Sequence, residues 1–328
     1  MNNEYEDSIK KEFEAAEGIS VEATEEKTTD LGSVDPNRMK RVTADDPEIR
    51  KIQELTGYMK LDLGLFPSSG KFYRDDFEIH IRAARVAEIR DFSTMEDEDP
   101  KDVDDKLNNI LSSCTKIIYG SQRGSYKDIL EEDRVYVILS IRELTFKEGE
   151  NRLMMPVKNR KCSTSSCKSQ DSVELRTNGL QFEMPDDSLE KYYDEATRSY
   201  AIQTKNYGVI NMAPPTIGVM RAMTDYIREK EQSGQPWDKS SVAIIPYMQR
   251  EWRGWSDKEI FSSITNLQGW DATKYSIVYR LAEKMRVGVK PEFVYPCQSC
   301  GAEVTVPLTF PGGIKSLFVI QDLSSELL

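Results

Sequence analysis

The sequence predicts an α+β fold with two helical lobes and separate β-hairpin segments. Helical and extended patterns occur in successive blocks, and they do not alternate strictly as they would in a parallel α/β protein. Asn178-Gly179, between two alternating apolar runs, is a strong signal for a two-residue hairpin. Four of the five cysteines fall in two close pairs. Together these observations predict that the lobes are joined through a zinc-ribbon-like site of four cysteines.

The pattern divides the chain of 328 residues into five segments. We expect an acidic, largely disordered tail at 1–46, an N-terminal mainly helical lobe at 47–150, a β-hairpin segment with the first cysteine pair at 151–212, a C-terminal helical lobe at 213–288, and a zinc-knuckle hairpin with a C-terminal tail at 289–328.

The tail holds most of the negative charge. Residues 1–36 contain eleven acidic residues and three lysines, which gives −8 of the chain's net charge of −12. Tyr5, Ile9 and Phe13 recur at helical spacing within this segment. Two interpretations remain open: a transient helical turn in a disordered arm, or a docking helix that orders in the groove of a partner.

The first lobe combines helices with a short hairpin. The turn at 67–70 lies beside extended apolar residues and indicates the hairpin. An apolar stripe predicts a helix from near Asp102 to Ile118, with Cys114 on its buried face. The acidic residues 131–133 favour a helix rather than a strand for the apolar run 135–146.

The second half begins and ends in β-structure. Hairpins are expected around Asn178-Gly179 and around 206–208. Three helices should follow, one opened by Pro215, one by the capping box of Ser256 and Glu259, and one after Asp271. The chain then closes in apolar strand segments around 293–306.

The cysteine pairs carry the chemistry. Cys297 and Cys300 are separated by two residues, so both sulfurs can reach one metal ion from a tight turn, and Gly301 can supply the positive φ of that turn. Cys162 and Cys167 are separated by four residues, within the range that metal knuckles use, and Lys and Arg residues flank them. We therefore expect one structural zinc ion on Cys162, Cys167, Cys297 and Cys300, with no coordination position open for catalysis.

Another interpretation treats the pairs as unrelated, with a redox-active pair at Cys297 and Cys300. Redox pairs with this spacing usually open a helix in a βαβ setting, whereas this pair lies between predicted strands. His80 is the single histidine of the chain. It lies in a strand-like segment, and we interpret it as a core or surface residue rather than a ligand.

Composition and motifs exclude several function classes. An acidic chain does not attract phosphate backbones over long range, which argues against a nucleic-acid partner. No apolar run approaches the ~20 residues that span a bilayer, so we expect no membrane partner. The common phosphate-binding, dinucleotide-binding, zinc-protease and hydrolase motifs are absent, and we expect a protein that is not an enzyme. The Trp252–Trp255 stretch is interpreted as local core, with an interface hot spot as the alternative.

Several segments, taken in order, resemble baseplate hub and hub-assembly proteins of contractile-tailed bacteriophages of the T-even type. They are Leu65-Phe66-Pro67-Ser68-Ser69-Gly70-Lys71, the strand and helix at 78–90, the cysteine-bearing helix at 107–118, the run 128–142, the first cysteine knuckle, Pro214-Pro215-Thr216 and the closing CxxCG hairpin.

The resemblance implies a structural or assembly component of the tail baseplate, located in the virion and made in the host cytoplasm. It implies contacts with hub proteins and with the tape measure protein, no catalytic residues, and the same four cysteines as the metal site. Two alternatives stay open: a tail-assembly chaperone that is absent from the mature virion, and a zinc-ribbon adaptor in nucleic-acid metabolism.

Overall fold

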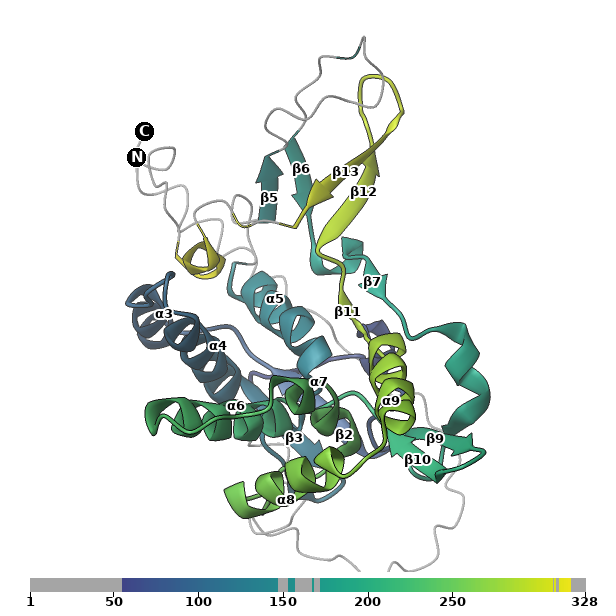
Figure 1. Cartoon of the computed structure of the whole chain (residues 1–328). Helices are drawn as coiled ribbons and strands as arrows, with labels where there is room; N and C mark the ends of the chain where they lie inside the picture. Colours follow the sequence, from purple (N-terminus) through teal and green to yellow (C-terminus); the bar gives the residue numbers. More distant parts are fainter. Residues whose placement is uncertain are drawn as a thin grey trace, which may run out of the picture. The chain divides into compact units, whose positions relative to one another are not determined.

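We describe the fold from a computed structural model of the protein. The structure describes residues 55–146, 153–156, 167, 172–308, 310 and 313–319. All of these belong to one compact unit that runs from Lys51 to Leu328 (Figure 1). Helices and antiparallel sheets are mixed along it, which confirms the α+β class. The expected tail at 1–46, with its docking-helix hypothesis, and Cys162 lie outside the described residues.

The first lobe contains a sheet as well as helices. Its four antiparallel strands lie in sequence order: β1 (Met59–Lys60), β2 (Phe77–Ile81), β3 (Thr115–Tyr119) and β4 (Gln122–Arg123). Its helices are α3 (Val86–Ser93), α4 (Pro100–Cys114) and α5 (Arg134–Thr145). The segment expected to be mainly helical therefore also provides a four-stranded sheet. The helix predicted over 135–146 is confirmed as α5.

Helix α4 ends earlier than its apolar stripe predicted. The backbone of Thr115 is extended, and Ile117 and Ile118 belong to β3, where they pair with Ile79 and Glu78 of β2. Both isoleucines are β-branched, so they fit a strand that has a partner better than another helical turn. The prediction of a helix as far as Ile118 was wrong. Cys114 is fully buried, as predicted.

The hairpin predicted at Asn178-Gly179 was also wrong. These residues lie in a 3-10 turn, η6 (Thr177–Gly179), and neither has the positive φ that a type I′ turn requires. The flanking strands pair elsewhere: β6 (Ser172–Leu175) with β5 (Leu153–Pro156), and β7 (Phe182–Glu183) with β11 (Gly288–Val289). Distant pairing partners have prevailed over a local turn signal.

The second predicted hairpin is confirmed. Strands β9 (Ser199–Thr204) and β10 (Gly208–Met212) pair antiparallel, and β8 (Tyr193–Asp194) lies on the other side of β9. The last strands, β12 (Glu292–Pro296) and β13 (Glu303–Pro307), also form a hairpin as expected. Short 3-10 helices connect these parts: η2 (Leu63–Leu65), η3 (Tyr126–Asp128), η4 (Glu131–Asp133), η7 (Asp187–Tyr192) and η8 (Ile314–Leu317).

Four helices form the second helical lobe: α6 (Ile217–Gln232), α7 (Lys239–Met248), α8 (Asp257–Gln268) and α9 (Ala272–Lys284). The residues predicted to begin α8 and α9 do cap these helices. Ser256 and Glu259 form the predicted capping box of α8, and Asp271 caps α9. Helix α7 was not predicted, because its apolar run is short and includes Pro246.

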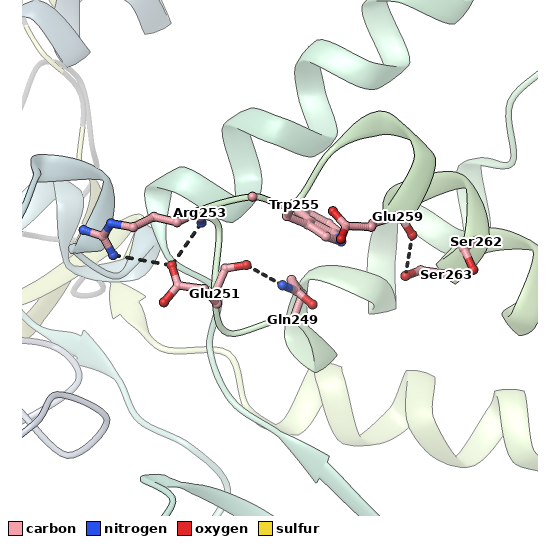
Figure 2. A pocket seen from close by; sticks show the side chains of 8 residues that line it. Gln249, Glu251, Arg253, Trp255, Glu259, Ser262 and Ser263 are labelled. Atoms are coloured by element: carbon pink, nitrogen blue, oxygen red, sulfur yellow. Dashed lines mark hydrogen bonds and ion pairs between the residues drawn. The ribbon is translucent and has the colours of Figure 1, made fainter.

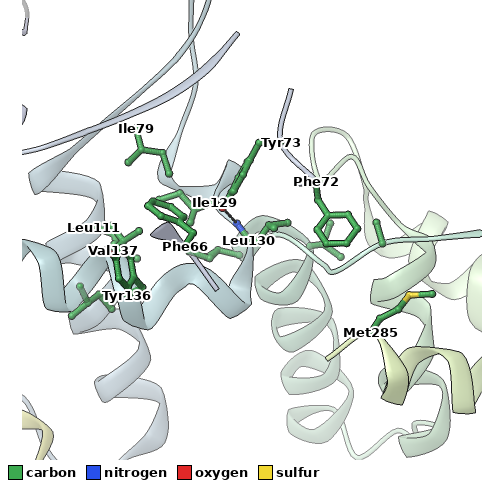
Figure 3. Packing of buried hydrophobic residues seen from close by; sticks show 14 of the residues in the cluster. Phe66, Phe72, Tyr73, Ile79, Leu111, Ile129, Leu130, Tyr136, Val137 and Met285 are labelled. Carbon is green, nitrogen blue, oxygen red and sulfur yellow. Dashed lines mark hydrogen bonds between the residues drawn. The ribbon is translucent and has the colours of Figure 1, made fainter. Parts of the chain in front are cut away.

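The two lobes share one apolar core and are joined by backbone hydrogen bonds. Leu130 forms a β-bridge with Thr216, Glu131 N donates to Pro215 O at 2.9 Å, and Ile217 N donates to Ile129 O at 2.8 Å. Ile129 and Leu130 lie within the buried cluster that Figure 3 shows. The sequence suggested that the lobes are joined through the cysteine site. The structure also joins them through these backbone bonds and the shared core.

One buried carboxylate fixes the loop that leads into β2. Asp133 accepts hydrogen bonds from Ser68 N at 2.9 Å, from Ser68 Oγ at 2.6 Å and from the Tyr73 hydroxyl at 2.8 Å. Tyr73 in turn accepts a bond from Leu130 N at 3.0 Å. The loop needs this support because Ser69, which is not a glycine, has a φ of 52°.

Substitution of Asp133 should change how stability depends on pH. Burial raises the pKa of Asp133 to about 6, while its three hydrogen-bond donors lower it. The unfolded chain releases this proton near its ordinary pKa of about 3.9. Between these values the folded state binds the extra proton, so the stabilisation from this group falls as the pH rises. Asp133→Asn removes the titration and places an amide against three donors.

We expect the wild-type chain to be more stable than Asp133→Asn. We also expect this advantage to shrink by on the order of 2 kcal/mol between about pH 4.5 and pH 7. Urea unfolding at both pH values measures it. A constant difference between the two proteins would contradict the role given to the carboxylate.

Candidate metal centre

The turn between β12 and β13 presents two cysteine sulfurs. Cys297 N donates to Ala302 O at 2.8 Å and Gly301 N donates to Cys297 O at 2.8 Å, which closes a tight loop. Gly301 has a φ of 73°, the left-handed conformation that the sequence predicted for it. Cys297 is buried, whereas Cys300 is exposed. The knuckle thus has one sulfur toward the protein and one toward solvent.

The third sulfur comes from a distant part of the chain. Cys167 lies in the connection between β5 and β6, and its Sγ is 3.7 Å from Sγ of Cys297. The ligand atoms of Cys167, Cys297 and Cys300 all lie within 4.8 Å of one another. In a tetrahedral zinc site with Zn–S bonds of about 2.3 Å, neighbouring sulfurs are roughly 3.8 Å apart. This spacing suits three ligands of one metal ion.

Two hydrogen bonds join the segment before β7 to the start of β12. Lys290 N donates to Gln181 O at 2.8 Å, and Gln181 Nε2 donates to Val294 O at 3.2 Å. Phe293 of β12 and Val304 and Val306 of β13 are buried. These contacts anchor the base of the β12–β13 hairpin, and the 3.7 Å approach of Cys167 Sγ to Cys297 Sγ places the β5–β6 connection beside its knuckle.

The donor set suits a soft or borderline metal ion. Three thiolates are typical ligands of zinc, and a fourth ligand would complete a closed structural site. Cys162 was predicted as that fourth ligand, and the described residues do not include it. The structure therefore brings together three of the four predicted site residues: Cys167, Cys297 and Cys300.

The remaining cysteine and the histidine have structural positions. Cys114 is buried at the end of α4, and burial raises the pKa of its thiol to about 11. His80 is buried in β2, with Nε2 2.9 Å from Oε2 of Glu78. Neither residue belongs to the sulfur cluster. Both were predicted to be outside the metal site.

The Trp-rich stretch is held by a second buried carboxylate. Asp128 accepts from Trp252 Nε1 at 2.7 Å, from Arg253 Nη2 at 2.6 Å and from Ser125 N at 2.7 Å. Trp255 is buried. These contacts favour the interpretation of local core over that of an exposed hot spot. No local pattern in the sequence indicates that Asp128 pairs with residues about 125 positions away.

Beside this stretch lies a polar pocket of about 370 Å³ (Figure 2). Its lining residues are Gln249, Glu251, Arg253, Gly254, Trp255, Glu259, Ser262 and Ser263. Much of the polar lining is already bonded internally. Arg253 N donates to Glu251 at 3.0 Å, and Ser263 Oγ donates to Glu259 O at 2.9 Å. The lining serves mainly to hold the loop before α8.

Comparisons with protein-family models, with curated proteins and with solved structures found no match. In the part of the chain that the structure describes, no helix has both the length and the apolar character to cross a membrane.

Loss of one knuckle sulfur should remove the response to a chelator. A metal on Cys167 and Cys297 ties residues 130 positions apart. Its binding energy also contributes to folding. The entropy of closing such a loop alone is worth about 4–5 kcal/mol. We expect a chelator to lower the melting temperature of the wild-type chain by several degrees.

The variant Cys300→Ser should start at the lower melting temperature and should not respond to the chelator. Differential scanning calorimetry of both proteins measures this. An unchanged wild-type midpoint in chelator would show that no metal stabilises the fold.

A larger side chain at Gly218 should destabilise the protein. A Cβ atom there would lie 2.4 Å from the ring of Trp252, so the indole would have to move away from Asp128. Overpacking of this kind costs about 1–3 kcal/mol. The control is Gly179→Ala, whose Cβ would meet its nearest neighbour at 3.5 Å. Equal unfolding free energies for the two variants would contradict the packing role of Trp252.

Proposed function

We propose that this chain is a zinc-stabilised, non-enzymatic structural or assembly component of a contractile phage tail baseplate, located in its central hub region. Its partners are other hub proteins and the tape measure protein. The zinc site has a ribbon-like form, with the β12–β13 knuckle as one half and the connection between β5 and β6 as the other. Cys162 supplies the fourth sulfur.

The observation that carries the proposal is the convergence of the cysteines. Only the fold can bring Cys167 to the knuckle, and the three described sulfurs lie within 4.8 Å of one another. A site closed by four thiolates leaves no position for substrate, so its contribution is mechanical. Such a site suits a protein that has to keep its shape within a large assembly.

The segments that carry the family resemblance also contact one another. Ser68 of the Leu65–Lys71 loop is bonded to Asp133, which immediately precedes α5. Thr216 of the Pro214-Pro215-Thr216 segment caps α6 and bridges to Leu130. The motifs are thus parts of one connected framework, which supports reading them as a set.

The buried carboxylates support a structural role as well. Asp133 and Asp128 are both buried, and each accepts three hydrogen bonds that fix a loop. A general acid or base needs access to a substrate. These two groups are instead committed to holding Ser68, Tyr73, Trp252 and Arg253.

Mass spectrometry of purified tailed particles tests the proposal. Particles from cells that make this chain should contain it at a fixed ratio to the other tail proteins. Electron microscopy of particles produced without it should show tails with defective baseplates. A chain found in assembly intermediates but absent from finished particles would identify the chaperone alternative. A chain absent from both would contradict the tail assignment.

A further inference from the structure

We propose that the sulfur cluster is also a site of reversible oxidation, at which Cys167 and Cys297 form a disulfide that joins the two hairpins in place of the metal. The inference depends only on the positions of the sulfurs. It does not depend on the phage assignment or on the identity of the fourth ligand.

Geometry favours this pair. The two Sγ atoms are 3.7 Å apart, while a disulfide bond is about 2.05 Å long. A small movement of two side chains is enough to close this gap. Removal of the metal leaves these sulfurs facing one another.

Exposure allows an oxidant to reach the cluster. Cys167 is partly exposed and Cys300 is exposed, whereas Cys297 is buried. Hydrogen peroxide can therefore reach Cys167 and Cys300 while Cys297 remains a protected resolving thiol, and the 3.7 Å approach of Cys167 to Cys297 favours the link between these two. Metal-bound cysteines are present as thiolates, the form that reacts with peroxides.

The chemistry balances in two steps. The Cys167 thiolate attacks hydrogen peroxide, the O–O bond breaks, and a sulfenic acid and hydroxide form. The Cys297 thiolate then attacks the sulfenic sulfur, an S–S bond forms, the S–O bond breaks, and a second hydroxide leaves. The two thiolates lose two electrons, the peroxide gains them, and the metal ion departs.

The two hairpins would therefore stay linked under both reducing and oxidising conditions. In a reducing compartment the metal joins residues 167 and 297, and in an oxidising one the disulfide does so. The pairing within the knuckle, Cys297 with Cys300, would have the opposite effect, because it would leave the hairpins unlinked. The choice of partner therefore decides whether oxidation preserves or opens this part of the fold.

The experiment treats the zinc-loaded full-length chain with hydrogen peroxide. A zinc-sensitive dye follows metal release, and non-reducing peptide mapping locates the disulfide. We expect a Cys167–Cys297 link, the loss of two hydrogen atoms in mass, and reversal by dithiothreitol. The oxidised chain should keep its melting temperature in chelator, unlike the reduced chain. Buried Cys114 is the internal control and should stay reduced.

Two variants sharpen the result. Cys300→Ser should still form the Cys167–Cys297 link, and Cys167→Ser should not keep the hairpins joined after oxidation. A wild-type map dominated by Cys297–Cys300 or Cys162–Cys167, or no disulfide at all, would overturn the proposal. A chain that binds no zinc but still forms the predicted link would contradict the zinc site and leave the oxidation proposal standing.

Discussion

The carboxylate of Asp133 is the constraint on which the rest of the architecture depends. It lies immediately before α5, and it accepts hydrogen bonds from Ser68 and Tyr73 of the 66–73 loop. The hydroxyl of Tyr73 in turn accepts a hydrogen bond from Leu130 N. Leu130 and its neighbours then form the backbone bonds to Thr216 and Ile217 that position α6. Loss of one donor would leave a buried carboxylate oxygen without a hydrogen bond, which is costly. The sheet, α5 and the second helical lobe are positioned together by this chain of contacts.

The cysteine cluster supplies a second constraint of a different kind. The hairpins β5–β6 and β12–β13 are two-stranded, and isolated hairpins of this size are marginally stable in water. In β12 and β13, the buried apolar side chains Phe293, Val304 and Val306 give the hairpin one packed face. The metal ion proposed for the sulfurs of both hairpins would add a link where the core alone is weak. With that metal, the body of the protein would be stabilised by its apolar core and the two hairpins by the sulfur–metal bonds.

Helix caps and the knuckle turn, which depend on residues close together in the chain, could be predicted from the sequence. Contacts between distant segments mostly could not. Ser256, Glu259 and Asp271 cap helices because capping bonds join neighbouring residues. Gly301 was recognisable because a knuckle turn needs a positive φ. The sequence did not show that β6 pairs with β5 rather than with β7, or that Ser68 and Tyr73 converge on Asp133, more than fifty positions away. The convergence of Cys167 with the knuckle followed from chemistry, since thiolates in a metal site must meet wherever they lie in the chain.

The most direct test of this account is zinc-edge X-ray absorption spectroscopy on the full-length chain purified under reducing conditions. We predict one zinc ion per chain with a first shell of four sulfur atoms at about 2.3 Å. A shell containing nitrogen or oxygen at about 2.0 Å, or a chain that retains no metal, would contradict the claim that the cysteines form one closed structural site.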